Sequence, residues 1–312
     1  MPAIRTERLR KTYGSVRALD GLDLTVESGT VFGYLGPNGA GKTTTIRLLT
    51  GLARPTGGRA WVAGVEIAAN RRELAHHIGY LPEEPAFYPW MTPAEFLDHV
   101  GRAFGLTAGE RAARTQELLE LTGLAGVRKR RIRGFSRGMR QRLGIAQALV
   151  NRPEVLLLDE PVSALDPGGR KEVLELIERL RETCTLFMST HILADVERIC
   201  DAVGILADGK LIVEARREDL IAQYAAPVFE IEGENDHAAE IQAWAETLRA
   251  RPWVSGVSVS GPGVRVVVAD VEVAKRELLA AAATAGLPLT RYEMVKPSLE
   301  DVFLRLVEKG GR

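Results

Sequence analysis

A run of glycines around one lysine is the first feature of the sequence that can do chemistry. The segment GPNGAGKTT fits G-x-x-x-x-G-K-[ST], in which glycines let consecutive backbone N–H groups turn toward one pyrophosphate. Lys42 supplies a full charge to the β and γ oxygens, Thr43 offers its hydroxyl to Mg²⁺, and Thr44 adds a second donor. The residues expected to surround the phosphates are Gly36, Pro37, Asn38, Gly39, Ala40, Gly41, Lys42, Thr43 and Thr44.

An acidic pair follows the most apolar strand candidate, because VLLLDE ends in Asp159 and Glu160. A Mg²⁺ ion bound at the glycine loop also needs a carboxylate at the tip of a neighbouring strand, and Asp159 meets that need. Glu160 beside it is expected to orient a water on the γ-phosphate as a general base. The competing interpretation is an acidic pair that only ends a strand at the surface.

The elements that position these residues alternate between short apolar strands and helices. A strand through Tyr34 precedes the glycine loop, and a helix from about Lys42 to near Gly51 follows it. The stretch PEVLLLDEP predicts a strand buried on both faces. A helix over 168–183 and a strand in TLFMSTH come next. This order of strand, glycine turn and helix predicts an open α/β sheet within residues 1–224.

Residues 225–312 follow a different order of elements. The patterns predict strands and helices in the order βαββαβ, which is the ferredoxin-like α+β pattern. The expected ranges are 228–232, 238–250, 254–260, 264–269, 271–285 and 289–294. A last helix, SLEDVFLRLVEK, opens on Ser298 as N-cap. No cluster of His, Cys or carboxylates marks a second chemical site in this sequence, so a regulatory or dimer-supporting role is expected.

Composition excludes several classes of protein. The 312 residues are 46% hydrophobic, and 41 basic residues balance 41 acidic ones, so the net charge offers no general attraction to nucleic acid or to an anionic bilayer. The charged N-terminal segment lacks a secretory signal and no apolar run reaches spanning length, so a cytoplasmic chain is expected. Cys184 and Cys200 match no metal-ligand spacing and are expected to be buried thiols.

Further motifs in a fixed order complete a resemblance to the ATP-binding cassette (ABC) ATPases over residues 4–224. They contain Tyr13 in KTYGSVRAL, Glu83 in GYLPEE, Ser136 and Gly138 in FSRGMRQRL, Asp166 in SALD, and His191 in STH. The resemblance implies a P-loop NTPase fold with a mixed sheet core and a helical subdomain at about 85–150. It also implies hydrolysis of ATP with Mg²⁺.

The resemblance implies a role for each of these motifs. Tyr13 would stack on adenine, with an ordinary core tyrosine as the alternative. Glu83 stands where the family commonly has glutamine, and it would ligate Mg²⁺ or hold the attacking water. His191 would hydrogen-bond the γ-phosphate, against the alternative of a histidine satisfied at a strand end. Asp166 would reach the phosphate loop of a partner chain.

The segment FSRGMRQRL implies that the protein works in pairs. Ser136 and the N–H groups near Gly138 begin a helix expected over 139–150, whose positive end favours an anion. In the family that anion is the γ-phosphate held by a second copy, so each ATP would lie between Lys42 of one chain and Ser136 of the other. One chain has one set of motifs, which predicts a head-to-tail homodimer with two composite sites. Arg137 stands where the family usually has glycine.

Two further segments bear on partners. Residues 128–142 hold eight basic residues and no acid, which suggests a nucleic-acid surface as one interpretation. The run lacks interleaved aromatics for base stacking, so a solvated surface whose field attracts the partner's ATP is favoured. The aromatic segment from Glu83 to Met91 predicts a docking surface, which in the family receives a short helix of the membrane subunit. A loop folded onto its own core is the alternative.

The expected function is an ATPase subunit on the inner face of the cell membrane that powers a separate integral membrane permease, with no nucleic acid as partner. The segment KPSLEDVFLRLV resembles the extension on ATPases of drug-efflux and sodium-efflux exporters, so drug or antibiotic efflux is one expected use. A soluble ABC ATPase acting on ribosomes or nucleic acid is the alternative, although such chains generally fuse two cassettes or carry long coiled coils. A non-hydrolysing binding module is a third class, against which Asp159, Glu160 and His191 argue.

Overall fold

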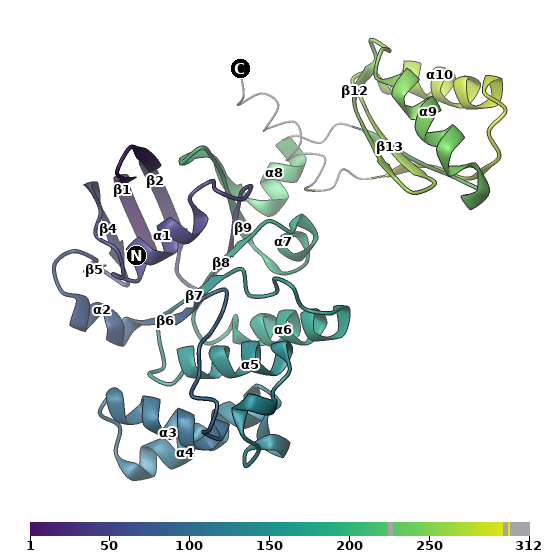
Figure 1. Ribbon diagram of the computed structural model, residues 1–312. Coiled ribbons are helices and arrows are strands. Elements are labelled where there is room, and N and C mark those ends of the chain that lie inside the picture. The colour runs from purple at the N-terminus through teal and green to yellow at the C-terminus, as the bar shows by residue number, and fades with distance from the viewer. Residues whose placement is uncertain (224–226, 296–298, 300–312) are drawn as a thin grey trace. The chain divides into compact units, whose positions relative to one another are not determined.

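The chain forms two compact units in a computed structural model that describes residues 1–223, 227–295 and 299 (Figure 1). The units are Met1–Arg217 and Glu218–Arg312. The division lies at the start of helix α8, Arg217–Gln223, a few residues before the boundary suggested by the sequence. Among the described helices, none combines the length and the apolar character needed to cross a bilayer.

Two sheets enclose the core of the first unit. An antiparallel sheet has the order β2-β1-β4-β5, with β1 Pro2–Tyr13, β2 Val16–Glu27, β4 Gly57–Val62 and β5 Val65–Glu66. A mostly parallel sheet has the order β10-β9-β3-β8-β7-β6, with β3 Val31–Leu35, β6 Ile78–Leu81, β7 Val155–Asp159, β8 Thr185–Thr190, β9 Ala202–Ala207 and β10 Lys210–Arg216. The predicted mixed sheet core is confirmed.

Helix α1, Lys42–Leu49, lies between the two sheets and contacts β2, β4 and β7. Its Ile46 joins Leu9 and Leu22 of the antiparallel sheet and Phe187 of the parallel sheet in one apolar cluster. Figure 1 shows α5 Arg137–Ala148, α6 Pro167–Leu180 and α7 Leu193–Ile199 along the other face of the parallel sheet. Strands β3, β7 and β8 are buried at every position, as strands covered on both faces must be.

The parallel strands bring distant parts of the sequence to one edge. Strands β3, β6, β7 and β8 run in the same direction, so their carboxyl ends lie together. The loops that leave this edge contain the glycine loop, Glu83, Glu160 and His191. Ligands of open α/β sheets bind at the carboxyl ends of the strands, which makes this edge the expected place for a site.

The helical subdomain begins with two well-capped helices. Helices α3, Pro93–Ala103, and α4, Ala108–Leu121, each open on a capping box. Helix α5 begins at Arg137, two residues before the expected start, because Ser136 caps it by accepting a hydrogen bond from Met139 N at 3.2 Å. The remaining short elements of this unit are α2 Arg71–His77 and the 3₁₀ helices η1 Ala125–Val127 and η2 Ile132–Gly134.

The second unit has the predicted βαββαβ order. Its antiparallel sheet runs β12-β13-β11-β14, and helices α9 and α10 share one apolar core with the sheet. The elements are β11 Val228–Gly233, η3 Asn235–His237, α9 Ala238–Leu248, β12 Val254–Ser260, β13 Gly263–Val268, α10 Val271–Thr284 and β14 Leu289–Val295. This is the expected ferredoxin-like arrangement. The last helix predicted from Ser298 lies outside the described residues.

Candidate active site

A cavity of about 560 Å³ opens where the parallel strands end. Its walls come from the glycine loop, from the loops after β6, β7 and β8, and from the turn between β9 and β10. The predicted site residues that line it are Pro37, Asn38, Gly39, Gly41, Lys42, Thr43, Thr44, Glu83, Glu160 and His191. Residues far apart in the sequence therefore meet around one space.

The glycine loop has a backbone that other residues do not readily adopt. Gly39 and Gly41 have φ angles of 84° and 110°. A Cβ atom on Gly41 would lie 2.6 Å from the carbonyl oxygen of Ala18, and one on Gly36 would lie 2.5 Å from that of Leu206. Gly41 also caps helix α1 in the left-handed conformation. The loop thus leads directly into a helix N-terminus, and backbone N–H groups in this arrangement favour phosphate.

Lys42 makes two hydrogen bonds and one ion pair inside the protein. Its Nζ lies 2.6 Å from Gly36 O, 3.3 Å from Pro37 O and 3.3 Å from Glu160 Oε1. The side chains of Lys42 and Glu160 are 6% and 9% exposed, so this ion pair is shielded from water. A phosphate that binds Lys42 would compete with Glu160 for the ammonium charge.

Glu160 is held at several points. Its Oε2 lies 2.9 Å from His191 Nδ1, and its backbone N–H donates to Ser189 Oγ at 3.0 Å. The φ angle of Glu160 is 46°, a left-handed conformation that costs a non-glycine residue on the order of 1–3 kcal/mol. The surrounding contacts hold the carboxylate in the cavity despite that cost.

Asp159 is 2% exposed and does not line the cavity, although Thr43, to which it is hydrogen-bonded, does. Burial raises the pKa of its carboxyl group, and the charge of Glu160 adds to the rise. Hydrogen bonds from Ser189 Oγ at 2.7 Å and Thr43 Oγ1 at 3.2 Å act in the opposite direction. The carboxylate and the Thr43 hydroxyl are neighbouring oxygen donors beside the phosphate loop, which fits Mg²⁺.

A divalent cation at this place would take few ligands from the protein. Within the part of the chain that the structure describes, no three His, Cys, Asp or Glu residues gather as a metal site. Mg²⁺ is commonly held by one or two protein groups, with phosphate and water completing the shell. Glu83 lines the same cavity and accepts a hydrogen bond from Ser163 Oγ at 3.5 Å.

Seven of the predicted residues do not line the cavity: Gly36, Ala40 and Asp159 are sequence neighbours of lining residues, whereas Tyr13, Ser136, Gly138 and Asp166 belong to other parts of the fold. Tyr13 ends β1 and is 46% exposed, with Lys11 Nζ 4.7 Å from its ring centroid. Asp166 caps helix α6 by accepting from Gly169 N at 3.3 Å, as Ser136 caps α5. A Cβ atom on Gly138 would lie 3.7 Å from Gly169 Cα, so the N-termini of α5 and α6 are neighbours. These groups do not line the site of their own chain.

Ser189 is one residue of the site that the sequence did not predict, as are Arg17, Ser163 and Asp208 in the cavity lining. It pairs with Asp159 in the parallel register of β7 and β8, and it hydrogen-bonds both the Asp159 carboxylate and the Glu160 backbone. Ser189 lies near the carboxyl end of β8, two residues before His191, and this position could have marked it as a residue of the site. The register of two parallel strands cannot be read from their sequences, so the contact itself was not predictable.

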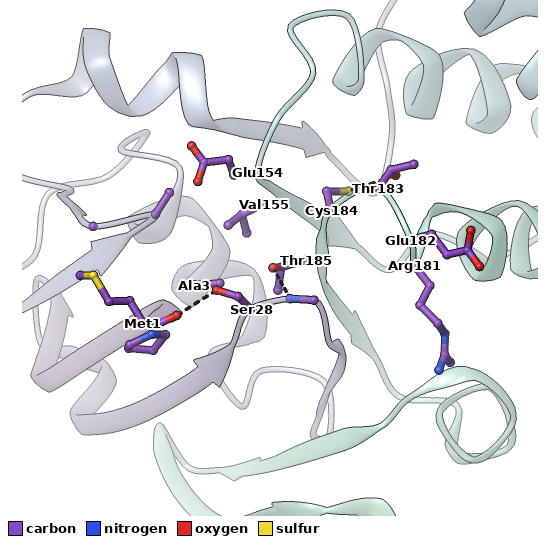
Figure 2. A pocket seen from close by; sticks show the side chains of 14 residues that line it. Met1, Ala3, Ser28, Glu154, Val155, Arg181, Glu182, Thr183, Cys184 and Thr185 are labelled. Carbon is purple, nitrogen blue, oxygen red and sulfur yellow. Dashed lines mark hydrogen bonds between the residues drawn. The ribbon is translucent and has the colours of Figure 1, made fainter.

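A second cavity, of about 440 Å³, lies beside the amino ends of β7 and β8 (Figure 2). Ser28 Oγ donates to Met1 O, and Gly29 N donates to Thr185 Oγ1 at its wall. Burial raises the pKa of the Cys184 thiol, which disfavours the reactive thiolate. Arg181 donates to Asp201 and to Ile199 O. None of the predicted site residues lines this space.

Comparison with known proteins defines the class. A family model described as ABC transporter matches residues 19–163, and one described as ATP-binding protein DrrA1-3-like, C-terminal domain, matches residues 216–307. The uncharacterised ABC transporter ATP-binding protein YxlF of Bacillus subtilis is 40% identical over 301 residues, 96% of this chain and 98% of YxlF. The chain therefore belongs to the ATP-binding proteins of ABC transporters.

Two more comparisons refine this class. The linearmycin resistance ATP-binding protein LnrL of Bacillus subtilis is 33% identical over 318 residues, 99% of each chain. The dimeric post-hydrolysis structure of the ATP-binding cassette MJ0796 with ADP and Pi aligns with a TM-score of 0.62 and 25% identity, over 68% of this chain and 98% of that one. The predicted ABC fold and the assignment as an ATPase are confirmed.

Proposed function

We propose that this chain is the ATP-hydrolysing subunit of an export system and powers a separate integral membrane permease from the cytoplasmic face of the cell membrane. The observation that carries the proposal is the cavity lined by Lys42, Thr43, Glu160 and His191, with Asp159 hydrogen-bonded to Thr43. The DrrA-like C-terminal domain and the relative named for linearmycin resistance support drug or antibiotic efflux as its use.

The first step is the exchange of partners at Lys42. A triphosphate brings more negative charge than one carboxylate, so the ammonium group leaves Glu160 and turns to the β and γ oxygens. The N–H groups of the glycine loop bind the same phosphates. Thr43 and Asp159 would hold Mg²⁺, with Glu83 near it, and the bound ion would neutralise charge on the phosphates. Tyr13 would stack on the adenine ring.

The exchange at Lys42 prepares Glu160 for catalysis. Its Oε1 is then free to accept a proton from the attacking water, while His191 Nδ1 holds Oε2 at 2.9 Å. His191 also lines the cavity and would contact the γ-phosphate. A base that is occupied by Lys42 before ATP arrives and released afterwards links the binding step to hydrolysis.

The composite site is completed by a second copy of the chain. Ser136, Gly138 and Asp166 lie outside the cavity of their own chain, at the neighbouring N-termini of α5 and α6. In a head-to-tail dimer these positive helix ends would meet the γ-phosphate held by the partner. The dimeric cassette among the structural neighbours supports this arrangement. Closure of the dimer would move the permease through the loop from Glu83 to Met91.

The test is the variant Glu160→Gln, which keeps the side-chain shape but removes the base. With ATP and Mg²⁺ it should accumulate as a dimer in light scattering, whereas wild type turns ATP over and returns to monomer. Lys42→Ala is the matched control and should stay monomeric with ATP, because it lacks the phosphate ligand. A Glu160→Gln protein that stays monomeric at saturating ATP contradicts the composite site.

A further inference from the structure

Arg17 is a cation of the nucleotide cavity to which the proposed function assigns no role. It is the second residue of strand β2, and it lines the cavity together with Val16 and Ala18. Its side chain is 64% exposed. In the described part of the chain, its guanidinium group donates one hydrogen bond, from Nη1 to Asp20 Oδ2 at 3.1 Å. A guanidinium group has five N–H donors in a planar fork, so Arg17 keeps most of them for a ligand.

The carboxylate of Asp20 holds Arg17 without depending on it. Arg10 Nε lies 3.9 Å from Asp20 Oδ1, and Lys210 Nζ lies 3.8 Å from Asp20 Oδ2. The hydrogen bond from Arg17 and the charges of all three cations hold the pKa of Asp20 below its ordinary value. Of these three cations, only Arg17 belongs to the cavity wall. Charge balance at Asp20 therefore does not explain why Arg17 lines the cavity.

The wall that contains Arg17 is attached to the glycine loop. Gly209, in the turn between β9 and β10, donates its N–H to Ala40 O at 3.0 Å, and a Cβ atom on it would lie 2.8 Å from Ala18 O. A Cβ atom on Gly41 would lie 2.6 Å from the same oxygen. The backbone of β2 therefore contacts the glycine loop one residue after Arg17, which fixes the place of Arg17 relative to a bound phosphate.

The order of residues along the β1–β2 hairpin matches the order of groups in ATP. Tyr13, which would stack on adenine, is paired with Val16 in the register of the two strands. Arg17 follows Val16, and Ala18 contacts the loop that would bind the β- and γ-phosphates. Arg17 thus lies between the expected places of the base and the β-phosphate. The ribose and the α-phosphate lie between these groups in ATP, and of the two only the α-phosphate is an anion.

We propose that Arg17 binds the α-phosphate of the nucleotide and that Asp20 positions its guanidinium group. The inference rests on the proposed binding of ATP in this cavity and adds a residue to it. Lys42 and Mg²⁺ would neutralise charge on the β- and γ-phosphates, which leaves the charge of the α-phosphate for another cation. Arginine forms charge-assisted hydrogen bonds with phosphate, often two at once. The α-phosphate is neither attacked nor released, so this contact serves nucleotide binding rather than the chemical step.

The first experiment is equilibrium binding of ATP and ADP to the full chain. A hydrogen bond to a charged group contributes about tenfold or more to affinity, so Arg17→Ala should weaken the binding of both nucleotides at least about tenfold. Arg10→Ala is the matched control, because Arg10 is 59% exposed and pairs with the same Asp20 but does not line the cavity. It removes the same charge and should bind nucleotide like wild type. In steady-state turnover, Arg17→Ala should raise KM for ATP more than it lowers kcat.

Sulfur substitution on the α-phosphate locates the contact. The two diastereomers of ATPαS carry sulfur in place of one or the other α-phosphate oxygen, and sulfur accepts hydrogen bonds weakly. Wild type should therefore prefer the diastereomer that keeps oxygen toward Arg17, and this preference should largely disappear in Arg17→Ala. The four affinities form a double-mutant cycle with one change in the protein and one in the ligand. Arg10→Ala should keep the wild-type preference, and Arg17→Lys should keep part of it.

Three results would overturn the proposal. The first is unchanged nucleotide affinity in Arg17→Ala, and the second is an equal loss in Arg10→Ala, which would assign the effect to the general field of the sheet. The third is a weakened Arg17→Ala that keeps the full diastereomer preference, which would place the contact away from the α-phosphate. Thermal unfolding shows that each variant is folded. A wild-type chain that binds no ATP would contradict the proposed function itself, whereas each of the three results can occur in a chain that binds and hydrolyses ATP.

Discussion

At the residue scale, His191 both lines the cavity and contacts the Glu160 carboxylate, so we propose that it positions this carboxylate. Its Nδ1 lies 2.9 Å from Glu160 Oε2, while Lys42 holds the other carboxylate oxygen. In the proposed mechanism ATP takes Lys42, and His191 would then be the side chain that still holds the Glu160 carboxylate. The loss of His191 should therefore affect the chemical step more than the binding of nucleotide.

We predict that His191→Ala lowers kcat for ATP hydrolysis roughly a hundredfold, with a smaller change in ATP affinity. Steady-state turnover and equilibrium nucleotide binding measure the two effects separately. His77→Ala is the control, because His77 pairs with Glu154 at 2.6 Å and does not line the nucleotide cavity. Equal losses of binding and turnover in His191→Ala would show that the histidine acts only as a phosphate ligand.

Asp159 makes the stability of the nucleotide-free protein depend on pH. Burial raises the pKa of its carboxyl group above the ordinary value of 3.8, so the folded chain binds this proton more tightly than the unfolded chain. The ionised group therefore lowers the free energy of unfolding as the pH rises from 3.8 through the raised pKa. Asp159→Asn should be more stable than wild type above that pKa, and inactive with Mg²⁺ and ATP.

Asp98 is the matched control, because its pKa is shifted in the opposite direction to that of Asp159. Hydrogen bonding from Arg111 holds the pKa of Asp98 below its ordinary value. The ionised carboxylate therefore stabilises the folded protein at pH values above the pKa that Asp98 has in the unfolded chain. This stability is lost as the pH falls through the lower pKa that Asp98 has in the folded chain. Asp98→Asn should lower the melting temperature at neutral pH, where Asp159→Asn raises it. Thermal unfolding across a pH series checks both signs, and a loss of stability in both variants would contradict the assignment for Asp159.

At the element scale, the glycine loop and helix α1 form one unit whose backbone tolerates little change. Gly41 starts α1 with a φ angle of 110°, and a Cβ atom there would meet Ala18 O at 2.6 Å and Leu19 Cδ2 at 2.9 Å. We predict that Gly41→Ala lowers the free energy of unfolding by roughly 2–3 kcal/mol, since it combines backbone strain with a steric clash. Urea unfolding measures the change.

Gly109 in helix α4 provides the comparison for the Gly41 substitution. It lies in the first turn of α4, where an added Cβ would meet no atom within 4 Å and the φ angle is ordinary. Gly109→Ala should raise the free energy of unfolding by roughly 0.5–1 kcal/mol through reduced backbone freedom. If both substitutions destabilised the protein equally, the special backbone of the phosphate loop would not be the cause.

Local sequence patterns predicted the helices and strands well. They could not predict the register between strands that are far apart in the sequence. The strand–loop–helix order around Lys42 and the βαββαβ order after Val228 both follow from periodicity and turn residues, and both are confirmed. Residues placed directly after strands, such as Glu160 and His191, were predictable because carboxyl ends meet at one edge. The contact of Ser189 with Asp159 and the approach of Arg133 to Pro89 depend on how distant segments pack.

At the scale of the whole molecule, the proposed dimer requires each chain to contribute one half of two different ATP sites. Lys42 and Glu160 line the cavity, whereas Ser136 caps α5 outside it. In the proposed dimer each ATP contacts Lys42 of one copy and Ser136 of the other. Two copies with different defects would then restore one complete site, which a mixing experiment can detect.

We predict that Lys42→Ala and Ser136→Asp are each inactive alone and that a one-to-one mixture recovers about a quarter of wild-type ATPase activity. Half of the randomly paired dimers are mixed, and each mixed dimer has both defects in one site and none in the other. Aspartate still caps α5 but puts a negative charge opposite the partner's γ-phosphate, so the variant should fold. Full activity of Ser136→Asp alone would place Ser136 away from ATP, and no recovery on mixing would contradict the exchange of half-sites between chains.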